Sequence, residues 1–273
     1  ETSYVSFGST ARPIFQKFTS QLDSLSSAPI GIFDSGIGGL TVAKAVMEAL
    51  PNEDIIYFGD TARVPYGIKS QETVREYALE ITDFLLQKKV KLILIACNTV
   101  SASAKPEIEK VAVQVPILDV ITSGTKAVFD YPGQKEVGVI GTLATINAGA
   151  YVKSIAGADP DVKVVQQACP LLVPLAEEGW TDNEVAMQTL RTYLEPFSKT
   201  GIQSIILGCT HYPLFKRQIQ EVLHKPGIHV IDSAQAIAES TREKLAEMQA
   251  LNEDGGRLEC YVTDRPQRFQ ELA

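Results

Sequence analysis

The chain has 273 residues, of which 45% are hydrophobic and 21% charged, so it has the composition of an ordinary globular protein. A net charge of −8 leaves no concentrated basic surface for nucleic-acid phosphates, and no apolar run approaches the roughly 20 residues that span a bilayer. We therefore expect no nucleic-acid or membrane partner. We also expect a cytoplasmic location, because the first residues show no secretory pattern.

The predicted elements begin after residues 1–28, which show only a weak helical pattern around Ile14 to Leu25 and are interpreted as an N-terminal extension. From Pro29 onward, short apolar runs alternate with amphipathic stretches, which is typical of parallel strands joined by helices. The predicted strands are Ile30–Phe33, Ile55–Phe58, Leu92–Ala96, Ile117–Ile121, Val137–Ile140, Val162–Val165, Ser204–Leu207, Ile228–Ile231 and Glu259–Val262. The predicted helices are Thr41–Leu50, Ser70–Lys88, Asn183–Phe197, Tyr212–Leu223 and Ala234–Leu251.

Residues 34–39 (DSGIGG) follow a predicted strand and open a predicted helix, where backbone N–H groups favour an anion. A dinucleotide site is one alternative, and Asp60 lies about where a ribose-binding acid would be. Thr41 in the third glycine position counts against it, as does Asp34, whose carboxylate would lie beside the pyrophosphate. An acid here suits an ammonium group better than a phosphate. A plain structural turn is the remaining alternative.

An approximate internal duplication is the most informative feature of the sequence. Residues 91–99 (KLILIACNT) and residues 203–211 (QSIILGCTH) each place a cysteine, Cys97 or Cys209, just past a predicted strand. A weaker echo pairs residues 31–35 with residues 138–142. Because ligands of open α/β sheets bind outside the carboxyl ends of strands, two such halves facing each other would enclose one site between two thiols.

Both thiols are predicted at strand-to-helix junctions, where the helix dipole can lower a cysteine pKa from about 8.5 toward neutrality. A single cysteine after an apolar strand is usually a small buried hydrophobe, but packing alone does not require the repeated thiol and flanking hydroxyl. His211 lies two residues beyond Cys209 and could exchange a proton at the rim of the same site. Its alternative is a capping or core histidine.

Two other kinds of site use the same residues. A zinc site could draw on Cys97, Cys209, His211 and Cys169, but zinc ligands usually come in close pairs and only Cys209 and His211 are near each other. A cysteine hydrolase with His211 as base leaves the second thiol unexplained. A binding protein that uses the site without chemistry is a further alternative. Cys169 and Cys260 are interpreted as structural, and with four widely spaced cysteines we expect free thiols.

Four motifs together resemble the aspartate/glutamate racemase superfamily, and within it the glutamate racemases. They are residues 34–40 (DSGIGGL), Pro65-Tyr66-Gly67, Cys97-Asn98-Thr99 and residues 208–211 (GCTH). The resemblance is collinear from about Pro29 to near Ala273. It implies an α/β fold of two pseudo-symmetric domains with mainly parallel sheets flanked by helices, and an active site in the cleft between them. We expect a first domain of residues 29–122 plus 226–273 and a second of residues 123–225.

The resemblance also implies the roles of individual residues. Cys97 and Cys209 would be the paired acid and base, Cys97 serving the D-enantiomer and Cys209 the L-enantiomer, with Asp34 and His211 managing their protons and Glu177 as an assisting acid. Residues expected to hold the substrate are Asp34, Ser35, Pro65, Tyr66, Gly67, Asn98, Thr99, Thr142, Thr145, Thr210 and His211. For Thr142 and Thr145, helix capping is the ordinary alternative.

The activity so implied is the cofactor-independent interconversion of L- and D-glutamate, because racemisation needs an acid–base group on each face of Cα. No lysine-bearing motif points to pyridoxal phosphate, and no metal is expected. D-Glutamate would feed peptidoglycan synthesis, and with it cell-wall biogenesis and cell shape. The expected partners are glutamate and a second copy of the chain in a homodimer. Aspartate racemase or another two-thiol isomerase is the close alternative.

Overall fold

The computed structural model describes residues 25–224 and 227–264, so the helical pattern predicted around Ile14 to Leu25 lies almost entirely outside the described residues. The strands are β1 (Ile30–Asp34), β2 (Ile55–Gly59), β3 (Leu92–Ile95), β4 (Ile117–Asp119), β5 (Glu136–Gly141), β6 (Lys163–Ala168), β7 (Ser204–Gly208), β8 (His229–Asp232) and β9 (Leu258–Val262). The helices are α2 (Leu40–Ala49), α3 (Gln71–Gln87), α4 (Asn98–Val111), α5 (Val120–Phe129), α6 (Leu143–Ala148), α7 (Ala150–Ala158), α8 (Leu172–Glu177), α9 (Glu184–Ser198), α10 (Lys216–Leu223) and α11 (Ser233–Glu247). Two short 3-10 turns are η1 (Tyr66–Ile68) and η2 (Tyr212–Phe215).

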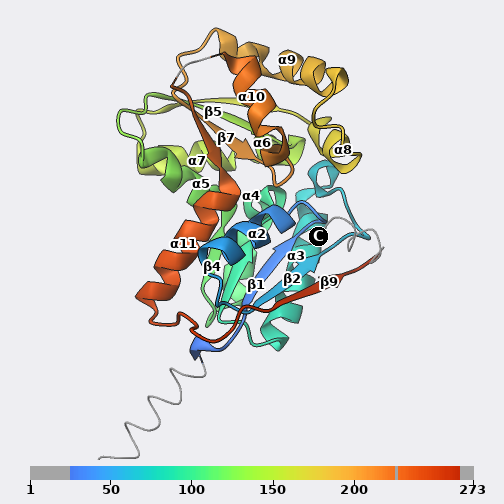
Figure 1. The fold of residues 1–273 in the computed structure, drawn as a ribbon, viewed down its shortest axis with the longest axis vertical. Coiled ribbons are helices and arrows are strands. Elements are labelled where there is room, and N and C mark those ends of the chain that lie inside the picture. Colours follow the sequence, from blue (N-terminus) through green and yellow to red (C-terminus); the bar gives the residue numbers. More distant parts are fainter. Residues whose placement is uncertain (1–24, 225–226, 265–273) are drawn as a thin grey trace, which may run out of the picture.

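The described strands form two sheets, and every strand pairing in them is parallel. The first sheet has the order β4-β3-β1-β2-β9 and the second the order β6-β5-β7-β8, with helices around each (Figure 1). The predicted α/β fold with two mainly parallel sheets is therefore confirmed. Strands β1, β3 and β7 are buried along their whole length, as expected for parallel strands covered on both faces.

The two sheets repeat one pattern. In the first, β1 lies between β2 and β3, and β4 follows beyond β3; in the second, β5 lies between β6 and β7, and β8 follows beyond β7. Strand β3 therefore corresponds to β7, and β1 to β5, which are the two pairings that the sequence repeats indicate. Because all strands are parallel within each sheet, the residues after β1 and β3 share one edge, and those after β5 and β7 share another.

The edge strands β4 and β8 lead into helices that cross to the opposite sheet. Asp119 caps α5 by accepting the N–H groups of Ile121 and Thr122, and Asp232 caps α11 by accepting that of Ala234. Helix α5 then packs against α7 and β7 of the second sheet, whereas α11 packs against α2 and β4 of the first and also against α5. This exchange of helices links the two halves of the molecule.

The expected division of the chain needs one correction. Residues 226–273 were assigned as a whole to the first domain, but β8 pairs with β7 in the second sheet. The chain returns to the first sheet only through α11, which leads toward β9 beside β2. An apolar run in a sequence predicts a strand but does not identify the neighbour to which that strand is hydrogen-bonded.

Several elements differ from the predicted pattern. The strand predicted at Ile117–Ile121 ends at Asp119 because that side chain caps α5. A helix start was expected after Cys97, where α4 begins, but no bounds were predicted for helices α4 to α8. In contrast, the apolar stripe of the predicted Ser70–Lys88 helix is buried in α3, as expected for a helix that covers a sheet. No described helix is both long and apolar enough to cross a membrane.

A buried ion pair anchors the start of β3, the strand that leads to Cys97. The side chains of Lys91 and Glu53 are almost completely buried, and Lys91 Nζ lies 2.6 Å from Glu53 Oε2. The same ammonium group donates to the carbonyl oxygens of Ser26 at 2.6 Å and Ala250 at 2.7 Å. Its three donors therefore join the start of the first sheet to the segment that follows α11.

We predict that Lys91→Met lowers the free energy of unfolding by about 3–5 kcal/mol, because it leaves the Glu53 carboxylate buried without its cation. Urea unfolding followed by circular dichroism measures this change. The control is Lys163→Met, which removes an ion pair with Glu136 whose lysine side chain is 72% exposed. That change should cost at most about 1 kcal/mol. Equal losses of unfolding free energy in the two variants would show that the buried Lys91–Glu53 pair contributes no more to stability than the exposed Lys163–Glu136 pair.

Candidate active site

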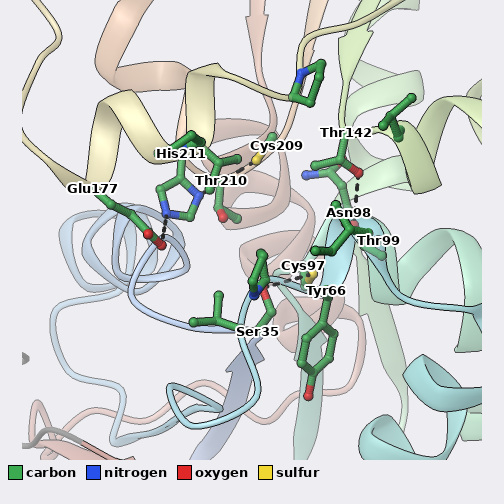
Figure 2. A pocket seen from close by; sticks show the side chains of 18 residues that line it. Ser35, Tyr66, Cys97, Asn98, Thr99, Thr142, Glu177, Cys209, Thr210 and His211 are labelled. Atoms are coloured by element: carbon green, nitrogen blue, oxygen red, sulfur yellow. Dashed lines mark hydrogen bonds and ion pairs between the residues drawn. The ribbon is translucent and has the colours of Figure 1, made fainter.

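Both repeated cysteines line one cavity of about 260 Å³ between the carboxyl ends of the two sheets. Cys97 follows β3 of the first sheet and Cys209 follows β7 of the second, so the walls that carry them come from the two halves of the molecule (Figure 2). Both residues are buried, and both are free cysteines. The cavity therefore brings together two thiols that lie 112 positions apart, from residue 97 to residue 209.

Cys97 occupies the N-cap position of α4, and its Sγ lies 3.6 Å from Ser35 Oγ. The predicted lowering of its pKa is wrong. Burial raises the pKa of the Cys97 thiol to about 12, and the nearby Asp34 carboxylate adds to this, outweighing the backbone N–H of Val100 and the Ser35 hydroxyl. Loss of hydration therefore destabilises the Cys97 thiolate more than the N-terminus of α4 stabilises it.

Cys209 lies beside an acid–base pair from its own half. Its Sγ is 3.8 Å from His211 Nδ1, and His211 Nε2 is 3.6 Å from Glu177 Oε1 (Figure 2). Burial by itself lowers the pKa of His211, but the contacts with Cys209 and Glu177 outweigh it, so the pKa is raised. The helix predicted at Tyr212–Leu223 begins as the turn η2, and α10 starts only at Lys216.

The glycine-rich turn after β1 closes directly on the turn that carries Cys209. A Cβ atom on Gly38 would lie 2.4 Å from Thr210 Oγ1 and 2.6 Å from His211 Cε1. Thr41 Oγ1 lies 2.9 Å from the carbonyl oxygen of Gly38 and 3.2 Å from that of Thr210, so its hydroxyl bridges the two turns. The start of α2 is thus covered by the second half of the molecule, which leaves no room there for the pyrophosphate that the dinucleotide alternative requires.

The wall formed by α4 and α6 presents neutral polar groups. Asn98 Oδ1 accepts the hydroxyl of Tyr151 at 2.7 Å, while Asn98 Nδ2 is buried without a partner. The hydroxyl oxygens of Thr99 and Thr142 are 3.1 Å apart (Figure 2). The hydroxyl oxygen of Thr145 lies 3.0 Å from that of Thr142. Thr142 also caps α6, so its capping alternative and its place in the cavity wall both hold. These amide and hydroxyl groups can donate to carboxylate oxygens.

Tyr66 is held at the cavity by a buried acid of the first sheet. Its hydroxyl donates to Asp60, whose side chain also accepts Arg63 Nε at 2.5 Å and Thr263 Oγ1 at 2.8 Å. Beside it, a Cβ on Gly67 would lie 2.9 Å from Thr142 Cβ, so the 3-10 turn η1 approaches α6 closely. Asp60 therefore has a structural role in the loop that carries Tyr66.

Of the residues predicted for the site, those that line the cavity are Ser35, Pro65, Tyr66, Gly67, Cys97, Asn98, Thr99, Thr142, Glu177, Cys209, Thr210 and His211. The structure places Asp34 and Thr145 one layer behind the wall. Asp34 accepts the N–H of Gly36 at 3.0 Å and lies 3.5 Å from Thr210 Oγ1. Burial raises the pKa of the Asp34 carboxyl, although His211 and nearby backbone N–H groups oppose this.

Sequence reasoning missed the apolar part of the wall, which consists of Val64, Ile68, Leu143, Pro170, Val173 and Pro174. Pro170 precedes α8, and Val173 and Pro174 belong to that short helix, which also supplies Glu177. Single apolar residues of this kind carry no sequence signal that separates a cavity wall from a core. The one hint is adjacency in the sequence to predicted site residues: Val64 and Ile68 flank Pro65-Tyr66-Gly67, and Leu143 follows Thr142.

The remaining candidates lie elsewhere. Cys169 is buried outside the cavity wall, Cys260 is exposed on β9, and His224 and His229 do not line the cavity. Within the part of the chain that the structure describes, no group of three or more His, Cys, Asp or Glu side chains could hold a metal ion.

The charges of the cavity limit its chemistry. Among the described residues, those that line the cavity include one acid, Glu177, and one potential cation, His211. None of them is Lys or Arg. Any carboxylate that enters must therefore be held mainly by neutral donors, such as side-chain amides, hydroxyls and the backbone at the start of α4. With a thiol from each half, the cavity can exchange protons with a small molecule from two sides.

Comparison with known proteins gives a consistent family. The sequence model of the family described as Asp/Glu/Hydantoin racemase matches residues 38–241. A glutamate racemase from Syntrophus aciditrophicus is 50% identical over 246 residues, covering 89% of this chain and 90% of that protein. The crystal structure of the Francisella tularensis glutamate racemase in complex with D-glutamate has a TM-score of 0.85 at 42% identity, covering 90% of this chain and 92% of that one. A glutamate racemase isoform from Bacillus anthracis has a TM-score of 0.87 at 34% identity, covering 91% and 93%.

The raised pKa of Cys97 predicts how this thiol reacts with iodoacetamide, because only the thiolate is alkylated. In the folded protein, the alkylation rate should rise about tenfold per pH unit from pH 7 to 10 without levelling off, since the pKa is about 12. Mass spectrometry of the Cys97 peptide measures the rate. In urea the same peptide should level off above about pH 8.5. A plateau near pH 8.5 in the folded protein would contradict the assignment.

Proposed function

The chain belongs to the Asp/Glu/Hydantoin racemase family, and on this basis we propose that it interconverts L- and D-glutamate. One observation carries the proposal: two thiols from corresponding strands of the two sheets line the same small cavity. Racemisation needs a proton removed from one face of Cα and another delivered to the opposite face. The names of the relatives reported above support glutamate as the substrate.

The proposed reaction uses Cys97 and Cys209 in turn. In one direction Cys209 takes the α-proton of L-glutamate as a thiolate, and Cys97 returns a proton to the other face as a thiol, giving D-glutamate. In the reverse direction Cys97 takes the proton and Cys209 returns one. The thiolate of Cys97 is costly, because burial raises the pKa of this thiol to about 12. The ammonium group of bound glutamate favours a thiolate, whereas its two carboxylates disfavour one and are held by the neutral donors of the cavity wall.

Each thiol has its own neighbouring groups for handling protons. Cys209 contacts His211, which pairs in turn with Glu177. On this side, His211 can donate and accept protons, and its pKa is raised. On the other side, Cys97 lies near Ser35 and within the field of the Asp34 carboxylate. We assign to Asp34 an indirect role, because it lies behind the cavity wall rather than in it.

The carbanion formed at Cα needs stabilisation that these residues can supply without a cofactor. Deprotonation at Cα places added charge on the substrate carboxylate, and Asn98, Thr99 and Thr142 present donors along one wall. Fixed donors in a cavity with little water stabilise such charge more than water does, because they need no reorientation. The reaction proposed here therefore involves the side chains and backbone of this chain alone.

We predict that the protein, with no added cofactor, removes the optical activity of L-glutamate in heavy water and introduces deuterium at Cα. Polarimetry and mass spectrometry follow the two changes. Equal tests with L-aspartate separate glutamate racemase from aspartate racemase, and the faster substrate identifies the activity. Retained optical rotation with no deuterium uptake from either amino acid would contradict the proposal. Tight glutamate binding without turnover would favour the binding-protein alternative.

The two single variants test the division of labour. Cys97→Ala and Cys209→Ala should each lower racemisation by about 1000-fold, because each removes the acid–base group of one face. Cys97→Ala should still exchange the α-proton of L-glutamate with solvent through Cys209, and Cys209→Ala that of D-glutamate through Cys97, both without inversion. The matched control is Cys169→Ala, which removes a buried thiol outside the cavity and should racemise within a few-fold of the parent. Loss of activity in the control to the same extent would remove the case for a specific thiol pair.

In the cell, we propose that the product D-glutamate is supplied to peptidoglycan synthesis in the cytoplasm, and hence to cell-wall biogenesis and cell shape, by a homodimer. The family membership supports this role. Expression of the chain in a bacterium that requires D-glutamate for growth should restore growth without the supplement, and sedimentation at equilibrium measures the oligomeric state. Failure of an expressed, active protein to restore growth would contradict the cellular role.

A further inference from the structure

A buried tyrosine lies behind the wall of the active site and contacts one of its residues. Tyr151 belongs to α7 beside the second sheet and is completely buried, and it is not among the residues that line the cavity. Its hydroxyl donates to Asn98 Oδ1 at 2.7 Å, and Asn98 is the first residue of α4 beside the first sheet. The bond therefore joins the two halves directly under the site.

The proton of this hydroxyl has one well-placed acceptor. Ser233 Oγ also lies 3.5 Å from Tyr151, but Ser233 donates its own proton to the carbonyl oxygen of Leu207 at 2.9 Å. A contact of 3.5 Å is at the limit of a hydrogen bond, whereas 2.7 Å is typical for one between oxygens. Burial raises the pKa of Tyr151, so the hydroxyl stays protonated and remains a donor.

The orientation of the Asn98 amide follows from this bond. An amide has an oxygen that accepts and a nitrogen that donates, and Tyr151 holds the oxygen. The nitrogen, Nδ2, is buried and has no partner, although Asn98 is only 2% exposed and lines the cavity. A buried donor without a partner costs free energy, so its place at a cavity wall calls for an acceptor that arrives with a ligand.

We propose that Tyr151 is a positioning residue for the reaction: its hydroxyl holds the Asn98 amide so that Nδ2 faces the substrate and donates to a carboxylate oxygen. The inference rests on the proposed function, because that function supplies the carboxylate. With the amide reversed, Asn98 would present a carbonyl oxygen to the carboxylate, and the two would repel each other. Tyr151 thereby sets the sign of the partial charge that one wall presents, in a cavity lined by no Lys or Arg of the described chain.

The test is a double-mutant cycle on the hydroxyl and the amide. Tyr151→Phe removes one oxygen atom and should lower kcat/KM for glutamate about tenfold, because the amide is no longer held in one orientation. Asn98→Ala should lower it about 100-fold, as loss of one donor to a developing charge does. The double variant should also fall about 100-fold, since Tyr151 acts through Asn98. A loss near 1000-fold, the product of two independent effects, would overturn the proposal.

Two further readouts separate positioning from a merely structural role. The Asn98 donor strengthens as charge grows on the carboxylate, so Tyr151→Phe should lower kcat more than it raises KM. The matched control is Tyr212→Phe, since Tyr212 is equally buried and donates one hydrogen bond, to the carbonyl oxygen of Cys169 at 2.8 Å. The thermal unfolding temperature should fall by a similar amount in Tyr151→Phe and Tyr212→Phe. The loss of kcat/KM caused by Tyr212→Phe, however, should multiply with the loss caused by Asn98→Ala, as expected for independent effects. Coupling of equal size in both cycles would contradict a specific role for Tyr151.

A variant that keeps Tyr151 intact provides an independent test. Asn98→Asp retains an acceptor for the tyrosine hydroxyl and presents its second carboxylate oxygen where Nδ2 stood. It should therefore weaken kcat/KM more than Asn98→Ala does, because that oxygen repels the substrate carboxylate. A smaller loss than in Asn98→Ala would mean that the amide has the opposite orientation, and would overturn the proposal even if Tyr151→Phe failed to fold.

The proposed function and this inference fail in different ways. The same cycle is therefore also measured as Kd for D-glutamate by titration calorimetry. A parent protein that binds D-glutamate but does not racemise it would overturn the function, while non-additive Kd values would still support the orientation of Asn98. A parent with normal racemisation and an additive cycle would overturn only the role of Tyr151. A parent with neither activity nor binding would overturn both.

Discussion

The active site depends on the close contact between two turns that follow strands of different sheets. Gly38, after β1, packs so tightly against Thr210 and His211, after β7, that its side-chain hydrogen cannot be replaced by a carbon without displacement. The Thr41 hydroxyl adds a hydrogen bond across the same contact. Because the two halves meet here, the cavity is small, and Cys97 and Cys209 are buried in its wall. The exchange of α5 and α11 also links the two halves.

Burial of the titratable groups determines the electrostatics of the site. Burial raises the pKa values of Cys97 and Asp34 and so disfavours negative charge on these two groups. Contacts among Cys209, His211 and Glu177 have the opposite effect on His211, which favours its cationic form. The two thiols therefore lie in different surroundings, although the strands that carry them are equivalent. Glutamate brings an ammonium group and two carboxylates into the cavity. Neutral donors such as Asn98 can form hydrogen bonds to the carboxylates, so that no Lys or Arg is needed there.

The accuracy of the sequence-based predictions follows from the range of the interactions involved. Every predicted strand is present, and those that are buried, such as β1, β3 and β7, are continuous apolar runs that local sequence reveals. The bounds of helices α4 to α8 were missed, because the apolar faces of these helices are short or contain small residues, as in Asn98–Val111. The partner of β8 and the crossing of α5 and α11 could not be predicted, because hydrogen bonding between strands and packing between helices join segments far apart in the chain. The raised pKa of Cys97 could not be predicted either. A position at a helix N-terminus suggested a lowered pKa, but burial, which depends on the tertiary structure, raises it.

The sequence by itself determined the fold class, the pairing of Cys97 with Cys209 through repeated motifs, and the family resemblance. Each of these is encoded in short, continuous stretches of residues. Only the tertiary structure decided that Asp34 and Thr145 lie behind the cavity wall, that apolar residues at α8 complete this wall, and that Tyr151 donates a hydrogen bond to Asn98. Those features depend on distances of a few ångströms between side chains from different elements. Such distances are set by how the two halves pack together, which no local pattern of residues specifies.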